Sequence, residues 1–274
     1  PRRAARIAPD PRANPGAGEA APRLDGVRRA VAVASGKGGV GKSTVAVNLA
    51  CAFARLGLAT GLVDADIYGP SAPRMLGVSE APAFVGGKLE PVRVHGIEVM
   101  SIGLLVAEDA AMIWRGPMAS QALRQMLQEV RWGGEAGLDM LVIDLPPGTG
   151  DVHLTLAQKL ALDGVIIVST PSEVALADAR RAHAMFGKLN PPVPVLGVIE
   201  NMAYFADPAT GAAIPIFGHG EARAEAARLG APFLGEIPID MAVRRGGDEG
   251  APVTAVDPDS DAARRFTDIA RALL

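Results

Sequence analysis

The sequence has little of several residue types, and cysteine is the scarcest. Cys51 is the only cysteine among 274 residues, so the chain cannot form an internal disulfide or supply a multi-cysteine metal site alone. Aromatic residues make up 4%, so the core must consist of Ala, Val, Leu and Ile. No apolar run approaches the ~18 residues that a membrane span needs.

Charge of one sign is not in large excess either. The formal net charge is −3, which predicts no strong non-specific attraction to nucleic acid. Apolar residues at 49% and charged residues at 21% are typical of a globular protein. The first 26 residues contain no apolar segment of the kind found in secretory signals, so we expect a cytoplasmic location.

Two parts of the chain differ in composition. Residues 1–27 are rich in Pro, Ala and Arg, which predicts a disordered arm or linker, with a basic docking arm as the alternative. In residues 28–274, short apolar segments alternate with amphipathic ones, which predicts one α/β domain with a doubly wound, mostly parallel sheet. We expect strands at 30–34, 60–64, 97–102, 138–144, 164–169, 194–200 and 233–237, and helices at 43–56, 117–131, 152–161, 174–189, 219–229 and 260–273.

A glycine-rich segment follows the first expected strand and has the pattern G-x-x-x-x-G-K-[ST]. Its glycines let successive N–H groups face a phosphate, and the following helix adds the positive end of its dipole. We expect Lys42 to reach the β- and γ-phosphates, Ser43 to bind Mg²⁺ and Thr44 to lie near the α-phosphate. The expected nucleotide-binding residues of this loop are Gly36, Lys37, Gly38, Gly39, Val40, Gly41, Lys42, Ser43 and Thr44.

A second lysine, Lys37, extends the pattern to G-K-G-G-x-G-K-[ST]. This loop resembles the deviant Walker A group of P-loop NTPases, which includes MinD, ParA and the nitrogenase iron protein. The resemblance implies a nitrogenase-iron-protein-like fold, and it implies that Lys37 reaches across a dimer interface to the partner's nucleotide. A solvated surface lysine is the alternative.

Carboxylates stand at the ends of two expected strands, where a parallel sheet places its ligand. The resemblance implies that Asp66 orients the attacking water, and Asp144 is expected to bind Mg²⁺ through water. Asp64 is interpreted as structural or as supporting the metal site indirectly. The expected catalytic set is therefore Lys37, Lys42, Asp66 and Asp144, with Ser43 and Asp144 as the metal residues. Asp64 and Asp151 are equally explained as turn or cap residues.

Adenine contacts are implied by the same resemblance for residues farther along the chain. Asn201 follows an expected strand, and Pro238 and Asp240 lie in a segment whose backbone lies against the base in related ATPases. A simple turn residue is the alternative for Asn201.

Several segments taken together resemble the Mrp/ApbC family of P-loop ATPases from about residue 27 to 274. They are residues 33–44, 64–71, 114–118, 144–151, 200–202 and 217–218. The resemblance implies a homodimeric iron–sulfur cluster carrier that binds ATP and Mg²⁺ and delivers clusters to apo-proteins. In many members, C-x-x-C pairs from two protomers supply the four thiolates of a [4Fe–4S] cluster.

This sequence departs from that pattern between Phe205 and Phe217, where it has no cysteine. Asp207 is a hard oxygen donor, and the segment from Asp207 to Gly211 predicts a β-turn between two short strands. Cys51 lies in an expected helix and is interpreted as a small buried hydrophobe. The [4Fe–4S] cluster is thus implied by resemblance only.

Other residues give weaker signals. The four histidines have no paired spacing and are expected to be structural or on the surface, with His219 the least ordinary because glycines flank it. The last helix carries apolar residues at helical spacing, and docking on the domain is expected rather than a membrane anchor. Alternatives to cluster carriage are a MinD/ParA-like positioning or scaffold ATPase without a cluster, and an ATPase that shares a cluster with another protein. No nucleic-acid or membrane partner is expected.

Overall fold

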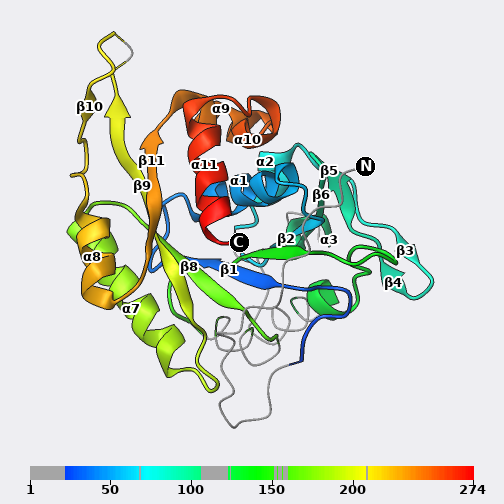
Figure 1. Cartoon of the computed structure of the whole chain (residues 1–274). Helices are drawn as coiled ribbons and strands as arrows, with labels where there is room; N and C mark the ends of the chain where they lie inside the picture. Colours follow the sequence, from blue (N-terminus) through cyan, green and yellow to red (C-terminus); the bar gives the residue numbers. More distant parts are fainter. Residues whose placement is uncertain are drawn as a thin grey trace.

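A central β-sheet with helices on both faces forms the body of the protein (Figure 1). The computed structural model describes residues 22–67, 69–105, 123, 125–150, 153, 156, 160–207 and 209–274. The first part of the expected helix at 117–131 and most of the one at 152–161 fall outside the described residues, as do Trp114, Arg115, Gly116, Pro117, Met118 and Asp151, whereas residues 125–128 are helical as expected.

The nine-stranded sheet has the order β10-β9-β8-β1-β7-β2-β6-β5, and β11 also pairs with β9. All pairings among β11, β9, β8, β1, β7, β2 and β6 are parallel, while β5 and β10 pair antiparallel at their edges. The strands are β1 (Ala30–Ala34), β2 (Thr60–Asp64), β5 (Val92–Val94), β6 (Ile97–Ser101), β7 (Met140–Asp144), β8 (Gly164–Ser169), β9 (Val195–Ala206), β10 (Ala213–Ile214) and β11 (Phe233–Ile239). A separate hairpin consists of β3 (Phe84–Val85) and β4 (Lys88–Leu89).

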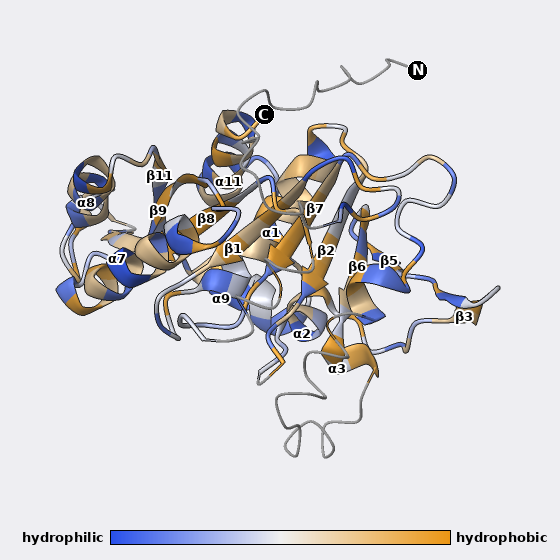
Figure 2. Ribbon diagram, turned by 90° about the horizontal axis from the view of Figure 1, so that it is seen from below, coloured by the Kyte–Doolittle hydropathy of each residue, from blue (hydrophilic) through white to orange (hydrophobic). Residues whose placement is uncertain are grey.

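The core is divided by the sheet into two layers. Along β1, Val31 and Val33 pack into one layer, whereas Ala30, Ala32 and Ala34 pack into the other, as the strand's period of two requires. The first layer is covered by α1 (Lys42–Arg55), α10 (Val253–Val256) and α11 (Asp261–Ala272), and α7 (Glu173–Lys188) and α8 (Glu221–Leu229) pack on the other side. In Figure 2 the central strands are mainly hydrophobic, whereas the helices that cover them carry both hydrophobic and hydrophilic residues. The expected doubly wound, mostly parallel α/β fold is confirmed.

Several short elements were not expected from the sequence. They are α2 (Ala72–Leu76), α3 (Ile102–Leu105), α9 (Met241–Glu249), α10 and the strands β3, β4 and β5. Most span five residues or fewer, too short for periodicity to identify.

Packing of the domain also begins before the expected boundary at Arg28: Leu24 and Val27 are buried, and Val27 forms a bridge with Leu138.

Strand β9 is longer than expected and continues six residues past the predicted end at residue 200. It leads into the predicted turn, where the Asp207 carboxylate accepts hydrogen bonds from the Ala209 N–H and the Thr210 hydroxyl at 2.8 and 2.7 Å. The chain then returns as β10, antiparallel to β9. A turn between two strands is thus confirmed, but the Gly211 N–H donates to the Asp207 carbonyl at 2.7 Å, so the turn is one residue longer than a β-turn, and β9 is not a short strand. Figure 1 shows this hairpin projecting from the body.

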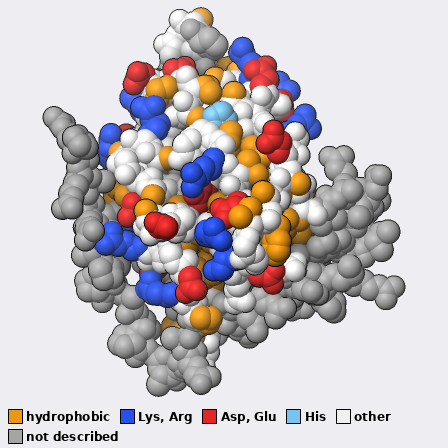
Figure 3. All heavy atoms as spheres, turned by 90° about the vertical axis from the view of Figure 1, so that its right-hand side faces the viewer, with side chains coloured by type: hydrophobic (Ala, Val, Ile, Leu, Met, Phe, Trp, Pro, Cys, Tyr) orange, Lys and Arg blue, Asp and Glu red, His pale blue; other side chains and the backbone are white. Residues whose placement is uncertain are grey.

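The last helix, α11, docks on the domain as expected. Its buried residues Ala262, Ala263, Phe266, Ile269 and Ala270 belong to the core layer that also contains α1. In the described part of the chain, no helix combines the length and apolar character that crossing a bilayer would require. On the face shown in Figure 3, charged side chains of both signs are interspersed.

Candidate nucleotide site

The glycine-rich loop enters α1 through Gly41, which has φ +79° and serves as the N-cap. Among the described residues, no side chain caps this helix, and its first turn holds no acidic residue. The first N–H groups of α1 and the positive end of its dipole are therefore available to an anion.

Two glycines of the loop are required by close contacts with neighbouring segments. A side chain at Gly41 would need the left-handed conformation and would overlap the Asn201 amide. A side chain at Gly36 would overlap the backbone of Asp178 on α7. Gly38 and Gly39 have open space around them, so no neighbouring residue requires a glycine at these two positions, which lie on the exposed face of the loop.

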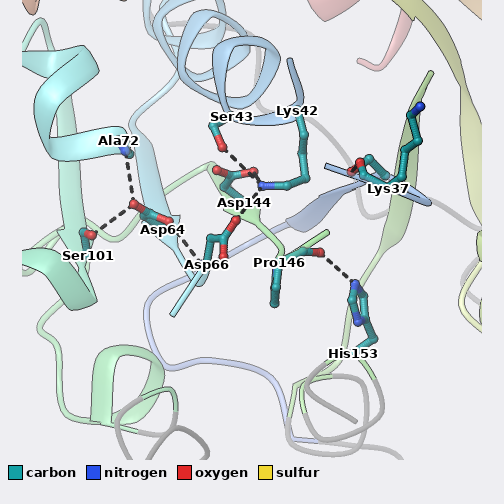
Figure 4. Close-up of polar contacts among 11 residues, drawn as sticks. Lys37, Lys42, Ser43, Asp64, Asp66, Ala72, Ser101, Asp144, Pro146 and His153 are labelled. Atoms are coloured by element: carbon teal, nitrogen blue, oxygen red, sulfur yellow. Dashed lines mark hydrogen bonds and ion pairs between the residues drawn. The ribbon is translucent and has the colours of Figure 1, made fainter. Parts of the chain in front are cut away.

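Lys42 is the centre of the site (Figure 4). Its buried ammonium donates to Asp144 Oδ1 at 2.5 Å and to Ser43 Oγ at 3.2 Å, and it lies 3.7 Å from Asp66 Oδ2. The structure thus brings together four predicted site residues, two from the loop (Lys42 and Ser43) and two that follow or end strands (Asp66 and Asp144). Lys37 is half-buried and points away from this group in Figure 4.

Asp144 has the chemistry expected of a residue that binds Mg²⁺. Its Oδ2 atom is buried and accepts no hydrogen bond from the described residues, while Oδ1 is paired with Lys42. Burial raises the pKa of Asp144, and the neighbouring Lys42 charge opposes that shift. A buried acceptor beside the Ser43 hydroxyl fits a hard divalent cation.

Asp64 and Asp66 have different surroundings, although they are two residues apart. Asp64 is fully buried and accepts hydrogen bonds from the Asp66 N–H, the Ala72 N–H and the Ser101 hydroxyl, each at 3.1 Å. Burial and the charge of Asp144 raise the pKa of Asp64 to about 7. Asp64 therefore holds the loop after β2 against α2 and β6, which leaves the Asp66 side chain directed at Lys42 (Figure 4).

A cavity of about 240 Å³ lies over the loop. It is lined by Ser35, Lys37, Gly38, Gly39, Gly41, Lys42, Ser43, Thr44, Asp66, Gly69, Ser71, Met75 and Pro147. Its lining is thus the phosphate loop on one side and the carboxyl ends of β2 and β7 on the other, where an open parallel sheet binds its ligand.

The residues expected to contact adenine take part in other interactions. Asn201 Nδ2 donates to the Val40 carbonyl at 2.8 Å, so it supports the phosphate loop from β9. The Asp240 carboxylate caps α9 by accepting from the N–H groups of Ala242 and Val243. Pro238 lies in β11. Adenine contacts by Asn201, Pro238 and Asp240 stay predictions.

The sequence predicts only a structural or surface position for His153, which lies in this region. Its ring is buried, and Nε2 and Nδ1 lie 3.0 and 3.2 Å from the carbonyls of Pro146 and Gly150, in the loop that follows Asp144. Burial lowers the pKa of His153. The neutral ring has one N–H, which donates to one of these two carbonyls and so holds the loop that follows Asp144.

Cys51 lies in α1 and is 1% exposed. Burial raises the pKa of its thiol to about 12, so the thiolate that iron requires is suppressed at neutral pH.

We predict that iodoacetamide leaves Cys51 unmodified in the native protein and alkylates it after unfolding in guanidinium, as measured by intact mass. Rapid alkylation under native conditions would contradict its burial. Cys51→Ala should retain nucleotide binding.

This fold and this loop define a P-loop NTPase of the deviant Walker A group. The family named ParA, with the description "NUBPL iron-transfer P-loop NTPase", matches residues 26–274. The chain belongs to this family, which confirms the resemblance seen in the sequence.

Relatives and solved structures agree with that assignment. An Arabidopsis thaliana protein named "Iron-sulfur protein required for NADH dehydrogenase, mitochondrial" is 49% identical over 91% of this chain and 79% of its own. The "Iron-sulfur cluster carrier protein" of Deinococcus radiodurans is 49% identical over 92% of this chain and 71% of its own. A nucleotide-binding protein from Archaeoglobus fulgidus, solved in complex with ADP, has a TM-score of 0.75 and 39% identity, covering 88% of this chain and 93% of its own.

Proposed function

We propose that this protein is a homodimeric Mg-ATP hydrolase in which the ATP state controls delivery of iron–sulfur clusters to apo-proteins. The observation that carries the ATPase part is the convergence of Lys42, Ser43, Asp66 and Asp144 at one edge of the sheet, beside the uncapped start of α1. Support for the cluster part comes from the names of the relatives. A cytoplasmic location is part of the proposal.

The residues of the site have separable roles in hydrolysis. Loop N–H groups and Lys42 bind the phosphates, and Ser43 and Asp144 would hold Mg²⁺, which neutralises charge on the β- and γ-phosphates when bound. Asp66 orients the attacking water. Lys37, directed away from the chain's own Lys42, supplies its charge to the nucleotide of the partner subunit. Asn201 and the backbone at Pro238 and Asp240 would receive the base.

The chain's own residues do not fit a [4Fe–4S] cluster. Such a cluster takes four thiolates, whereas a homodimer of this chain has two copies of the buried Cys51. The turn at residues 207–212 supplies oxygen donors instead, and both Asp207 oxygens already accept hydrogen bonds. We therefore propose that a partner protein supplies the cluster's ligands and that this ATPase acts on the shared assembly.

Anaerobic reconstitution with iron and sulfide tests this proposal, with quantification of both elements per chain. We expect iron at background for the protein alone, together with Mg²⁺-dependent ATP hydrolysis. Cluster transfer to an apo-ferredoxin from an added cluster donor should then be faster with ATP. Stable loading of the protein alone would contradict the need for outside ligands, and transfer indifferent to ATP would contradict nucleotide control.

A MinD/ParA-like positioning or scaffold ATPase is the second candidate, and the missing cysteine pair favours it. The "cell division ATPase MinD" of Pyrococcus furiosus shares the fold, with a TM-score of 0.66 at 22% identity. This candidate requires ATP-dependent co-sedimentation with anionic vesicles or with DNA. Absence of such binding, together with ATP-dependent cluster transfer, would exclude it.

Replacing Lys37 tests the dimer. Lys37→Ala should bind ATP within a few-fold of wild type but lose hydrolysis, because the partner's nucleotide lacks one positive charge in the transition state. Loss of one such group costs about 10²–10³-fold in kcat. Turnover and sedimentation velocity should be measured together, with the exposed Lys188→Ala as control. Normal turnover by a monomeric Lys37→Ala would contradict the role in trans.

A further inference from the structure

A second group of metal-ligating side chains lies away from the phosphate loop, at the outer part of the sheet. Its members are Glu200 of β9, Glu236 of β11 and His219, which precedes α8. One ligand atom from each residue lies within 4.8 Å of the other two. Side chains from three separate segments thus converge within the size of one coordination sphere.

The sheet register places two carboxylates next to each other here. Glu200 and Glu236 are direct partners in the parallel pairing of β9 with β11, so their side chains lie side by side on the same face. Glu200 is fully buried, and among the described residues no Lys or Arg forms an ion pair with it. Two carboxylates directly opposite each other repel, and Arg265 forms an ion pair with Glu236 from one side only, so a cation between the two carboxylates would stabilise them further.

The existing contacts leave room for a metal ion. Glu200 uses its two oxygens to accept from the N–H groups of Gly220 and Ala222 at 2.9 and 2.7 Å, and each carboxylate oxygen has a second lone pair. His219 Nε2 lies 2.9 Å from Glu236 Oε2. Arg265 approaches the other oxygen of Glu236 at 3.7 Å, too far for a direct hydrogen bond.

The imidazole is also held in place from its other side. The ring of Tyr204 meets that of His219 edge to face, with 5.3 Å between centroids, and the Tyr204 hydroxyl accepts from Arg265 at 2.5 Å. The two backbone bonds likewise fix Glu200 against the start of α8. Orientation of ligands by surrounding groups is what metal sites require.

We propose that Glu200, His219 and Glu236 bind a single divalent first-row transition-metal ion. One imidazole and two carboxylates suit Fe²⁺, Mn²⁺, Co²⁺ or Zn²⁺ and lack the thiolates that select a cluster. The remaining positions of the ion are filled by water through the exposed side of His219. This site is separate from the one assigned to Mg²⁺, and it does not depend on ATP hydrolysis.

Titration with Co²⁺ tests the proposal directly, because Co²⁺ bound in a protein site gives visible d–d absorption. The full chain should carry no polyhistidine tag, and an excess of Mg²⁺ and ADP should be present to occupy the nucleotide site. Bound cobalt is quantified after dialysis, and Zn²⁺ is then added as competitor. We expect saturable binding of about one Co²⁺ per chain and its displacement by Zn²⁺.

Substitutions identify the ligands. His219→Ala and Glu236→Gln should each weaken Co²⁺ binding more than about 10-fold, since even outer partners of metal ligands are worth about 10–100-fold. Glu200 is a poorer test because it also fixes α8. His183→Ala removes an imidazole from α7 and should bind Co²⁺ as wild type does. Circular dichroism and thermal unfolding establish that the variants are folded.

Two results would overturn the proposal. One is the absence of saturable Co²⁺ binding by the wild-type chain under these conditions. The other is wild-type affinity in folded His219→Ala and Glu236→Gln, which would place the bound metal elsewhere. In either case, the three side chains would be only a helix cap and a histidine–carboxylate pair.

Discussion

Lys42→Ala is expected to abolish ATP turnover and to weaken binding of the triphosphate strongly. Lys42 is the cation at the centre of the site, with its ammonium within 3.7 Å of Asp66 and 2.5 Å of Asp144. Removing one preorganised charge from a phosphoryl-transfer site costs about 10²–10³-fold in kcat. Because the proposed mechanism also places this lysine on the phosphates of ATP before the reaction, we expect affinity for ATP to fall as well.

The same substitution should lower the free energy of unfolding. Asp144 is fully buried, and Lys42 is its salt-bridge partner at 2.5 Å. Breaking a buried pair by removing one partner costs about 3–5 kcal/mol, less whatever Asp144 recovers by taking up a proton. Denaturant unfolding should therefore show a reduced midpoint for Lys42→Ala.

A double variant separates stability from chemistry. Lys42→Ala with Asp144→Asn removes the unpaired charge, so it should regain much of the lost stability while ATP turnover stays absent. Lys188→Ala, an exposed lysine on α7, should match wild type in both respects. Phosphate release and binding of a fluorescent ATP analogue provide the measurements. Normal turnover in Lys42→Ala would refute the assignment of the phosphate loop.

The sheet could be predicted because its strands are short, continuously apolar segments. Strands β1, β2, β7 and β8 are buried along their whole length, so each is marked by composition alone. Helices α7 and α11 could be predicted from the spacing of their apolar residues, because each helix buries one face. Short helices such as α2 were not predicted because a helix of about one turn has too few residues to show a period.

The convergence at the phosphate site was also predictable in outline. A loop motif fixes Lys42 and Ser43, and carboxylates at the ends of parallel strands meet at the same edge. The different roles of Asp64 and Asp66 could not be predicted as well. Only the structure shows that Asp64 is tied to Ala72 and Ser101 while Asp66 is directed at Lys42.

Contacts between distant segments could not be predicted, because they depend on strand register. Asn201 supports Val40 across 161 positions in the sequence, although resemblance suggested a role at the base. Likewise, Glu200 and Glu236 are neighbours only because β11 pairs with β9 in a particular register. No spacing within the sequence marks either relation.

Asp66→Asn is expected to retain ATP binding and lose hydrolysis. Its side chain lies at the edge of the cavity, 13% exposed and 3.7 Å from Lys42, so it can reach both water and the terminal phosphate. An amide keeps the size of the carboxylate but cannot accept a proton or orient water through two acceptor oxygens. Removal of a positioned general base costs about 10²–10⁴-fold.

The decisive comparison is between single-turnover hydrolysis and equilibrium binding. For Asp66→Asn, kcat should fall at least about 100-fold while the Kd for ATP changes by no more than a few-fold, because the lost interaction belongs to the transition state. Asp268→Asn, an exposed carboxylate of α11, should behave as wild type in both measurements. Asp64→Asn should instead lower thermal stability, since Asp64 accepts three hydrogen bonds in the interior.

Two outcomes for Asp66→Asn would redirect the mechanism. Wild-type hydrolysis would mean that water is oriented by another group, for example one in the loop after Asp144. Loss of ATP binding equal to the loss of turnover would mean that Asp66 acts on the ground state through Lys42. A folded variant that binds ATP tightly, fails to hydrolyse it and accumulates as a dimer would show that the γ-phosphate holds the two protomers together. It could then be used to ask whether delivery of a cluster requires hydrolysis or only the ATP-bound state.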